Sequence, residues 1–165
     1  MTVHSAGILL YRRAARADAA GLEVLLAHPG GPFYSGKDDG VWSIPKGEYE
    51  PTNEDALAAA RREFSEETGA EVPDGEPLDL GRIEQRKGKV VHSFGVEGTF
   101  DPSALVSNEF EMEWPPRSGR TQRFPEVDRA EWFGLDTARE KILARQGVFL
   151  DRLLAALGLS GGDSR

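Results

Sequence analysis

Three glutamates in the middle of the chain have the spacing of a metal site on a helix. Glu63, Glu66 and Glu67 stand at positions i, i+3 and i+4, which a helix turning about 100° per residue brings to one side. Like charges at this spacing destabilise an isolated helix. A divalent cation such as Mg²⁺, which prefers oxygen ligands and keeps some of its waters, removes that cost. The pattern therefore predicts a phosphoryl-transfer site, in which substrate phosphate oxygens complete the metal shell.

An acidic helix face also has a simpler explanation as a solvated surface. Exposed glutamates are common, and Arg61 and Arg62 partly offset the charge of this segment. The neighbouring residues help to decide between the two interpretations. Segment 47–70 has the sequence Gly-Glu-Tyr-Glu-Pro-Thr-Asn-Glu-Asp-Ala-Leu-Ala-Ala-Ala-Arg-Arg-Glu-Phe-Ser-Glu-Glu-Thr-Gly-Ala.

This segment closely resembles the Nudix box. In that family pattern a Gly is followed by a Glu and then, after a fixed gap, by Arg-Glu, an apolar residue, any residue, Glu-Glu, any residue and Gly. The matching residues here are Glu54, Arg62, Glu63, Phe64, Glu66, Glu67 and Gly69, with the required seven residues between Glu54 and Arg62. So many fixed positions favour the metal site over the solvated surface.

The chain departs from the box pattern at one point. Six residues, rather than five, separate Gly47 from Glu54. The additional residue falls around Thr52 and Asn53, where a longer loop costs little and either side chain can cap the following helix. The departure therefore affects the position of Gly47 and leaves the carboxylate helix intact.

The resemblance implies roles for the glutamates of the box. Carboxylates at the positions of Glu63, Glu66 and Glu67 hold divalent metal, which is Mg²⁺ or, in its place, Mn²⁺. The base that accepts a proton from the attacking water is then Glu63 or Glu66, and the sequence does not choose between them. In this mechanism a metal-positioned water attacks phosphorus while the metal neutralises charge on the phosphate oxygens.

The resemblance also implies roles for residues around the glutamates. Arg62 and Glu54 are expected to form an ion pair that orients the catalytic groups. A backbone carbonyl near the box glycine, at Lys46 or Gly47, is expected to join the metal shell. Some family members recruit another carboxylate from outside the box. The candidates in this chain are Glu109, Glu111, Glu113 and Glu126, although each is more often a surface residue.

Several residues outside the box are candidates for substrate binding. Segment 42–47, Trp-Ser-Ile-Pro-Lys-Gly, resembles the segment before the box in the branch that includes diadenosine tetraphosphate hydrolases and diphosphoinositol polyphosphate phosphohydrolases, so Lys46 can offer a cation to a phosphate chain. Aromatic rings can stack on a base, although most aromatic residues belong to the core. The aromatic candidates are Trp42, Phe33 and Tyr34, and the further cationic candidates are Lys37, Arg117 and Arg120.

The expected reaction is Mg²⁺-dependent hydrolysis of a phosphoanhydride bond in a nucleoside diphosphate derivative. The motif before the box favours a nucleoside triphosphate or a dinucleoside polyphosphate. Hydrolysis of ADP-ribose or another nucleotide sugar is the main alternative, and a strongly basic pocket for diphosphoinositol phosphates fits this acidic chain less well. A hypothesis of another class is a catalytically silent module that binds a nucleotide, but such a module has no chemical need for the three glutamates.

Composition limits the partners. The chain has 165 residues, 39% of them hydrophobic, which favours a single domain over residues 1–159 with a frayed tail over 160–165. A formal net charge of −8 excludes a nucleic-acid polymer but allows a small nucleotide. The absence of cysteine, of a leader and of a long apolar stretch indicates a cytoplasmic protein that does not enter membranes. The oligomeric state stays open.

Hydrophobic patterning predicts the elements that position the site. We expect strands over residues 4–11, 22–28, 81–85, 90–97, 110–114 and 130–133, and helices over 54–68, 136–143 and 148–157. Segment 29–40 contains four glycines and two prolines, which predicts a loop. The resemblance implies that these elements form an α/β Nudix fold, a mixed β-sheet sandwiched between α-helices.

Overall fold

A mixed six-stranded sheet forms the centre of the molecule. The computed structural model describes residues 1–14 and 21–159, so the predicted tail over 160–165 lies outside the described residues. The strand order is β4-β5-β1-β2-β8, with β3 paired to β1 beside this path. The main strands are β1 (Val3–Arg13), β2 (Leu22–Pro29), β3 (Lys46–Tyr49), β4 (Leu78–Arg86), β5 (Lys89–Glu97) and β8 (Val127–Gly134). Because β1 and β5 are parallel and the other neighbours antiparallel, the sheet is mixed, as expected.

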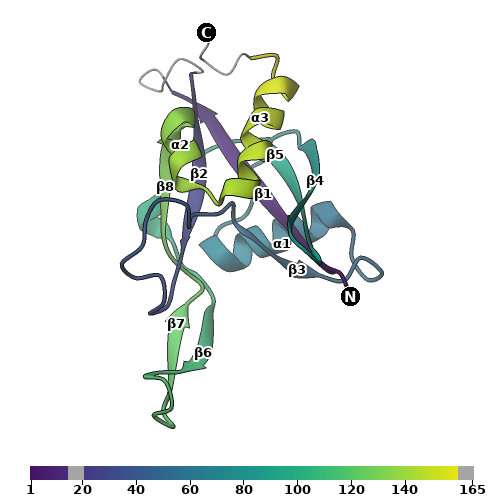
Figure 1. Ribbon diagram of the computed structural model, residues 1–165. Coiled ribbons are helices and arrows are strands. Elements are labelled where there is room, and N and C mark those ends of the chain that lie inside the picture. Colours follow the sequence, from purple (N-terminus) through teal and green to yellow (C-terminus); the bar gives the residue numbers. More distant parts are fainter. Residues whose placement is uncertain (15–20, 160–165) are drawn as a thin grey trace.

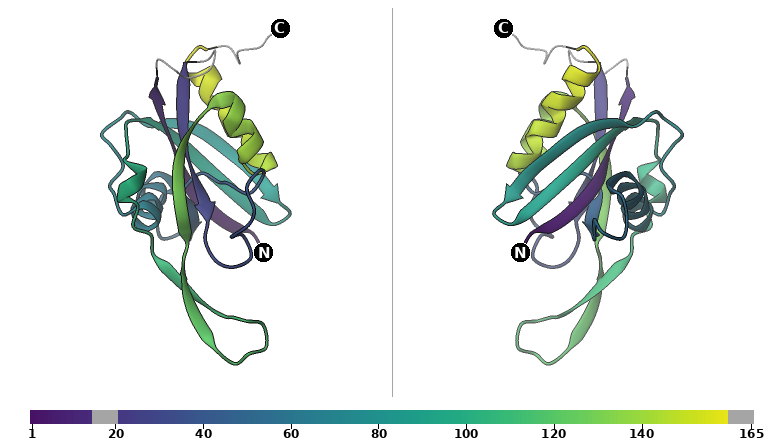
Figure 2. Two further views of the ribbon diagram at one scale, coloured as in Figure 1. Left: turned by 90° about the vertical axis from the view of Figure 1, so that its left-hand side faces the viewer. Right: turned by 90° about the vertical axis from the view of Figure 1, so that its right-hand side faces the viewer.

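Helices cover both faces of this sheet. Helix α1 (Ala56–Thr68) lies on one face, and α2 (Leu135–Lys141) and α3 (Gly147–Ala156) lie on the other (Figures 1 and 2). The central strand β1 is buried on both sides. Ile8 faces the α1 side together with Phe64, whereas Leu9 faces the α3 side together with Phe149. This alternation follows from the period of two in a strand and explains why the sequence of β1 is apolar almost throughout.

Strand β1 is the branch point of the sheet. Its first residues pair with β3, from His4 opposite Tyr49 to Gly7 opposite Lys46, and its last residues pair with β2. Both β2 and β3 therefore lie along the same edge of β1 at different heights. The side chain of Gly7 must be absent because a Cβ there would crowd the Pro45 carbonyl and Lys46. The fork brings the residue before the box glycine directly onto the central strand.

The structure corrects the start of the box helix. Helix α1 begins at Ala56, and its N-cap is Asp55, whose carboxylate accepts a hydrogen bond of 2.8 Å from the Ala58 N–H. The expected cap, Thr52 or Asn53, lies in the exposed turn before the helix. The end of the helix agrees with the prediction because Gly69 caps it in the left-handed conformation, with φ of 82°.

A two-stranded hairpin projects from the body. Strands β6 (Glu109–Glu113) and β7 (Thr121–Pro125) pair only with each other in the described residues and extend away from the main sheet (Figure 1). The sequence predicted a strand near β6 but missed β7. Residues Thr121, Gln122 and Arg123 are exposed in succession, so β7 lacks the alternation that marks a half-buried strand. No helix in the described part of the chain is long and apolar enough to cross a membrane.

The corrected N-cap can be tested by stability measurements. Replacing Asp55 by Ala removes the acceptor for the Ala58 N–H, so we expect Asp55→Ala to lower the free energy of unfolding by about 1 kcal/mol, and Asp55→Asn to retain most of it. Urea denaturation measures the change. Thr52→Ala and Asn53→Ala are the controls, with expected changes within about 0.5 kcal/mol. An equal loss in either control would contradict the assignment of Asp55.

Candidate functional site

The box glutamates meet the backbone of β3 at the start of the site. Glu63 is buried, with 8% of the residue exposed, and its carboxylate lies against Gly47. A Cβ at Gly47 would overlap this carboxylate. Glycine is therefore required here by close packing between α1 and β3. The additional residue between Gly47 and Glu54 is absorbed in the turn over 50–55 and does not move the glycine away from the helix.

An ion-pair network organises the exposed side of the glutamates. Arg62 binds Glu54 through two hydrogen bonds of 2.9 Å, which is the expected pair. The same guanidinium donates to Glu63 at 2.8 Å and to Glu66 at 3.2 Å. The hydrogen bonds from Arg62, above all to Glu54, raise the pKa of the guanidinium above its ordinary value. A single arginine thus fixes the positions of three carboxylates.

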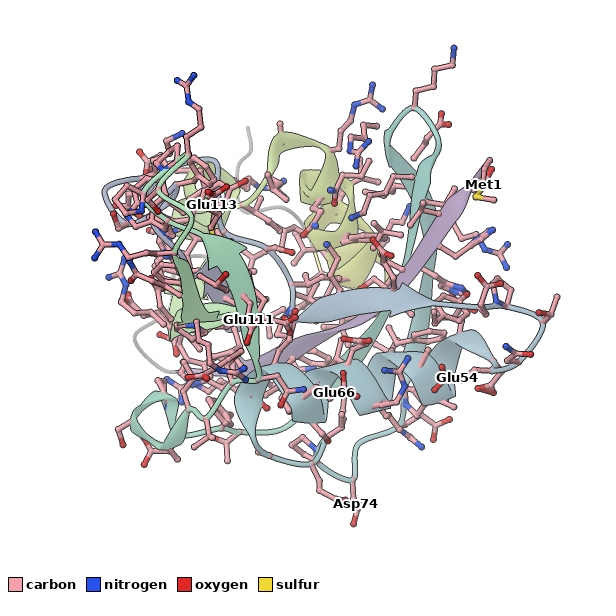
Figure 3. The ribbon with its side chains drawn as sticks, turned by 90° about the horizontal axis from the view of Figure 1, so that it is seen from below. Met1, Glu54, Glu66, Asp74, Glu111 and Glu113 are labelled. Atoms are coloured by element: carbon pink, nitrogen blue, oxygen red, sulfur yellow. The ribbon has the colours of Figure 1, made fainter. Side chains whose placement is uncertain are left out.

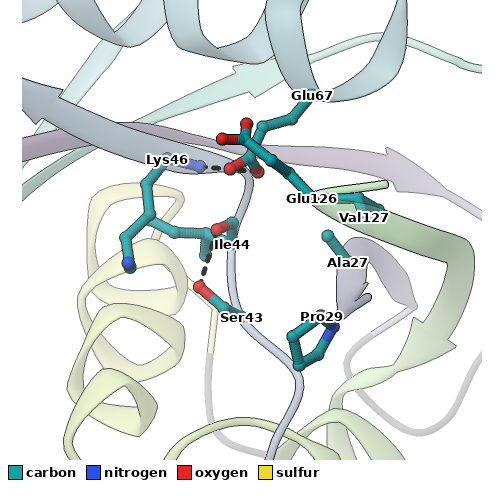
Figure 4. Close-up of a pocket in the computed structure, with 8 residues that line it drawn as sticks. All are labelled: Ala27, Pro29, Ser43, Ile44, Lys46, Glu67, Glu126 and Val127. Atoms are coloured by element: carbon teal, nitrogen blue, oxygen red, sulfur yellow. Dashed lines mark hydrogen bonds between the residues drawn. The ribbon is translucent and has the colours of Figure 1, made fainter. Parts of the chain in front are cut away.

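Glu67 lies on the inner side of the site, next to the strand that precedes the box. Its carboxylate accepts a hydrogen bond of 3.2 Å from the Lys46 N–H (Figure 4). Burial raises the pKa of Glu67 to about 8, and the charges of Glu126 and Glu63 act in the same direction. Burial also lowers the pKa of the Lys46 ammonium, with a further contribution from Lys89. Groups of like charge are thus held close together here. Glu67 lies near Glu63 and Glu126, and Lys46 lies near Lys89.

These residues surround a pocket of about 450 Å³. Helix α1 and strand β3 contribute most of the residues described above, and β1, the start of β5 and the base of the hairpin complete the wall. The lining residues are Ser5, Lys46, Gly47, Glu48, Glu63, Glu66, Glu67, Lys89, Asn108, Glu109 and Glu126. A smaller pocket of about 120 Å³ adjoins it through Lys46, Glu67 and Glu126, and has a more apolar lining that includes Ile44 and Val127 (Figure 4).

The structure distinguishes among the carboxylates outside the box. Glu126 and Glu109 line the pocket. Burial, followed by the charge of Glu66, raises the pKa of Glu126. Glu111 and Glu113 lie successively farther along β6 from the helix (Figure 3) and do not line the pocket. Glu126 is therefore the candidate that shares both pockets with Glu67.

The donor set fits a hard divalent cation. The carboxylates of Glu63, Glu66, Glu67 and Glu126 and the nearby backbone of Gly47 all offer oxygen atoms, which Mg²⁺ and Mn²⁺ prefer. Within residues 1–14 and 21–159, no three acidic or histidine side chains are already gathered as a metal cluster. In the described structure Arg62 donates hydrogen bonds to Glu63 and Glu66, and the Lys46 N–H donates to Glu67.

The structure corrects the substrate-binding prediction for Trp42. It also places Phe33 and Arg117 outside the carboxylate pocket. Trp42 is 1% exposed and packs edge-to-face on His28 and Phe133, so its ring belongs to the core and offers no face to a base. Phe33 is 58% exposed on the loop over 30–40. Arg117 lies in the turn of the β6–β7 hairpin, outside the carboxylate pocket. Only Lys46 among the predicted substrate ligands lines that pocket.

Sequence reasoning missed four polar residues of the pocket, Ser5, Glu48, Lys89 and Asn108. Ser5 is 1% exposed, and its hydroxyl has no hydrogen-bond partner in the described structure. Lys89 begins β5 and forms no ion pair with a described carboxylate, although it lies close enough to Lys46 to lower its pKa. Both residues reach the pocket through the pairing of β5 with β1, which places Val3 opposite Lys89 and Ser5 opposite Val91. No sequence pattern links them to the box.

Known structures share this arrangement of elements. An Ap4A hydrolase from C. elegans, in a binary complex, is 23% identical and superposes with a TM-score of 0.62, covering 93% of this chain and 98% of that one. A mutT/nudix family protein from Listeria innocua is 17% identical, with a TM-score of 0.60 and 94% coverage of each chain. The NUDIX domain of Shewanella oneidensis NrtR, complexed with ADP ribose, is 18% identical, with a TM-score of 0.59 and coverage of 95% and 89%. These likenesses establish the fold.

Sequence comparison establishes the family. None of the curated proteins matches the chain significantly. The model of the NUDIX domain, in contrast, matches residues 1–153 and so includes the box, the pocket and nearly the whole described chain. The three box glutamates, Glu63, Glu66 and Glu67, also line one pocket of the structure together with Gly47. The chain therefore belongs to the NUDIX domain family and is a pyrophosphohydrolase of that family.

Proposed function

We propose that the protein hydrolyses a phosphoanhydride bond of a nucleoside triphosphate or dinucleoside polyphosphate with the help of Mg²⁺. The observation that carries this proposal is the pocket in which three box glutamates face the backbone of Gly47 and two lysines. The carboxylates suit a divalent cation, and the lysines suit a phosphate chain. A pocket with carboxylates alone would bind a cation but repel the polyphosphate.

The metal-binding role falls to Glu63, Glu66 and Glu67, with Gly47 as the backbone ligand. When bound, Mg²⁺ supplies charge neutralisation of the phosphate oxygens and lowers the pKa of a coordinated water. Either Glu63 or Glu66 then accepts the proton of the attacking water. Arg62 positions both carboxylates through its hydrogen bonds and pairs with Glu54 on its other side. Arg62 is thus proposed to orient the catalytic groups, as the resemblance implied.

The polyphosphate chain is proposed to lie along Lys46 and Lys89. These lysines have no carboxylate partner within ion-pair distance among the described residues, and each is only partly exposed. An unpaired cation in a partly desolvated pocket gains more from a phosphate than a fully solvated one. The hydroxyl of Ser5 provides a further donor at the wall of the same pocket. Phe33 and Arg117 are proposed to contact more distant parts of the substrate.

Removal of one carboxylate tests the metal site. Because Glu67→Gln keeps the shape of the side chain but loses its charge, we expect the fold to survive and Mg²⁺-dependent kcat to fall on the order of 10²- to 10³-fold. Steady-state hydrolysis with and without Mg²⁺ measures the effect. The matched control is Glu76→Gln, the same chemical change at an exposed loop residue outside the pocket. Full activity in Glu67→Gln would disprove the assignment of the metal site.

The same assay distinguishes the role of Glu126 from that of the other carboxylates outside the box. We expect Glu126→Gln to lower kcat or weaken Mg²⁺ binding about 10- to 100-fold, because its carboxylate adjoins Glu67. Glu111→Gln is expected to leave both quantities unchanged, since Glu111 lies on the hairpin outside the pocket. Mg²⁺ titration of activity distinguishes a change in metal affinity from a change in turnover. Equal effects of the two substitutions would contradict a role for Glu126 in the site.

A substrate panel tests the proposed class. We expect the wild-type protein to release mononucleotides from nucleoside triphosphates or dinucleoside polyphosphates, with ADP-ribose and other nucleotide sugars as comparison compounds. Chromatographic identification of the products also shows which phosphorus is attacked. Turnover of ADP-ribose alone would replace the proposed substrate class and leave the metal site unaffected. No turnover of any compound would favour a nucleotide-binding module instead.

A further inference from the structure

An aromatic pair, with Phe33 exposed and Trp114 partly buried, lies outside the carboxylate pocket, where the loop over 30–40 meets the β6–β7 hairpin. Phe33 packs edge-to-face on Trp114, with ring centroids 5.5 Å apart and ring planes at 82°. This contact leaves Phe33 58% exposed. An aromatic face in water is a surface on which any nucleobase can stack. We refer to the loop over 30–40 together with the hairpin over 109–125 as the recognition arm.

The loop half of the recognition arm is fixed by buried side chains. The ring of His28, 1% exposed, bridges the Lys37 carbonyl at 2.7 Å and the Asp128 carboxylate at 2.8 Å. The indole N–H of Trp42 donates to Asp38 at 2.8 Å. Because strong contacts from the core hold the loop, Phe33 is presented in a defined position before any ligand binds. Such preorganisation lowers the entropic cost of binding.

A continuous series of hydrogen bonds connects the recognition arm to the box helix. The Asn108 N–H donates to the Glu66 carbonyl at 2.9 Å, and the Glu126 N–H donates to the Asn108 carbonyl at 2.8 Å. The Gly30 N–H in turn donates to the Glu126 carbonyl at 3.0 Å. Helix, hairpin and loop are thus joined at one place. The aromatic pair therefore has a fixed relation to the carboxylates.

The recognition arm reaches away from the carboxylates and ends in unpaired cations. Glu109 lines the pocket, and the five residue steps from it to Trp114 correspond to about 17 Å of extended chain. Figure 2 shows the hairpin projecting beyond the body. Arg123 pairs with acidic residues of β6, whereas Arg117 and Arg120 in the turn form no ion pair with a described carboxylate. The far end thus offers both ring surface and positive charge.

We propose that the recognition arm binds the second nucleoside of a dinucleoside polyphosphate and so gives these substrates an advantage over nucleoside triphosphates. This inference rests on the proposed function and specifies its substrate. When the phosphate chain lies at the carboxylates, a dinucleoside polyphosphate carries a base on each side of it. A nucleoside triphosphate has one base and a terminal phosphate, so it has no second base to stack on Phe33 or Trp114. The guanidinium groups of the turn complement the negative charge of the same ligand.

The test compares diadenosine tetraphosphate with ATP in variants of the aromatic pair. We expect Phe33→Ala and Trp114→Ala to raise the KM for diadenosine tetraphosphate about tenfold and the KM for ATP much less, because only the first compound carries a second base. Val148→Ala is the control, because it truncates an exposed apolar residue on α3. Parallel changes for both substrates, or no change for either, would overturn the proposal.

Fluorescence separates stacking from a structural role. Stacking of a base on Trp114 should quench its emission when diadenosine tetraphosphate binds, and ATP should quench it less. Trp114→Phe retains an aromatic face, so it should keep most of the affinity and lose the quenching. If the wild-type protein hydrolyses neither compound, the proposed function fails, yet selective quenching still supports the recognition arm. If diadenosine tetraphosphate does not quench the wild-type emission more than ATP does, the proposed binding role of the recognition arm is overturned, whether or not the protein is active.

Discussion

The close contact between α1 and β3 is the constraint on which the site depends. Glu63 is buried against Gly47, where no Cβ fits. Burying a carboxylate is costly unless it is paired and hydrogen-bonded, and Arg62 meets this requirement with a hydrogen bond of 2.8 Å. Phe64, on the adjacent face of the helix, anchors α1 in the core of the sheet. Apolar packing thus offsets the cost of holding charged groups together.

The charges around this contact are balanced on the outer side of the site and only partly on the inner side. Arg62 neutralises the outer carboxylates, including Glu54 and Glu66, through direct hydrogen bonds. Glu67, farther inside, has only the Lys46 N–H as a hydrogen-bond partner among the described residues, and its pKa is raised by burial. The inner part of the site therefore retains unfavourable electrostatic energy, which a bound cation would relieve. Stability and metal affinity are coupled at the same residues.

The connections around α1 link the carboxylate pocket to the β6–β7 hairpin. A helix end leaves carbonyl groups without intrahelical partners, and here the Glu66 and Thr68 carbonyls accept from the Asn108 and Val106 N–H groups. The hairpin therefore begins where the carboxylate helix ends. These backbone hydrogen bonds hold the start of the hairpin beside the pocket.

The sequence by itself determined the family, the box helix and most of the strands. Glu63, Glu66 and Glu67 are separated by helical spacing, and most strands of the sheet alternate or are continuously apolar, so local patterns were sufficient for the helix and for every strand of the main sheet except β3. The N-cap at Asp55 was misassigned because several polar residues in one turn can cap a helix equally well. Strand β7 was missed because its exposed residues carry no periodic pattern.

Only the tertiary structure decided which distant residues complete the site. Ser5, Lys89 and Glu126 reach the pocket through strand pairing and through the hairpin, over separations that no local pattern records. Trp42 moved from the substrate candidates to the core because its neighbours His28 and Phe133 come from other strands. Spacing along one helix fixes which of its side chains share a face. Contacts between elements depend on how the whole sheet packs, and that packing is a property of the complete chain.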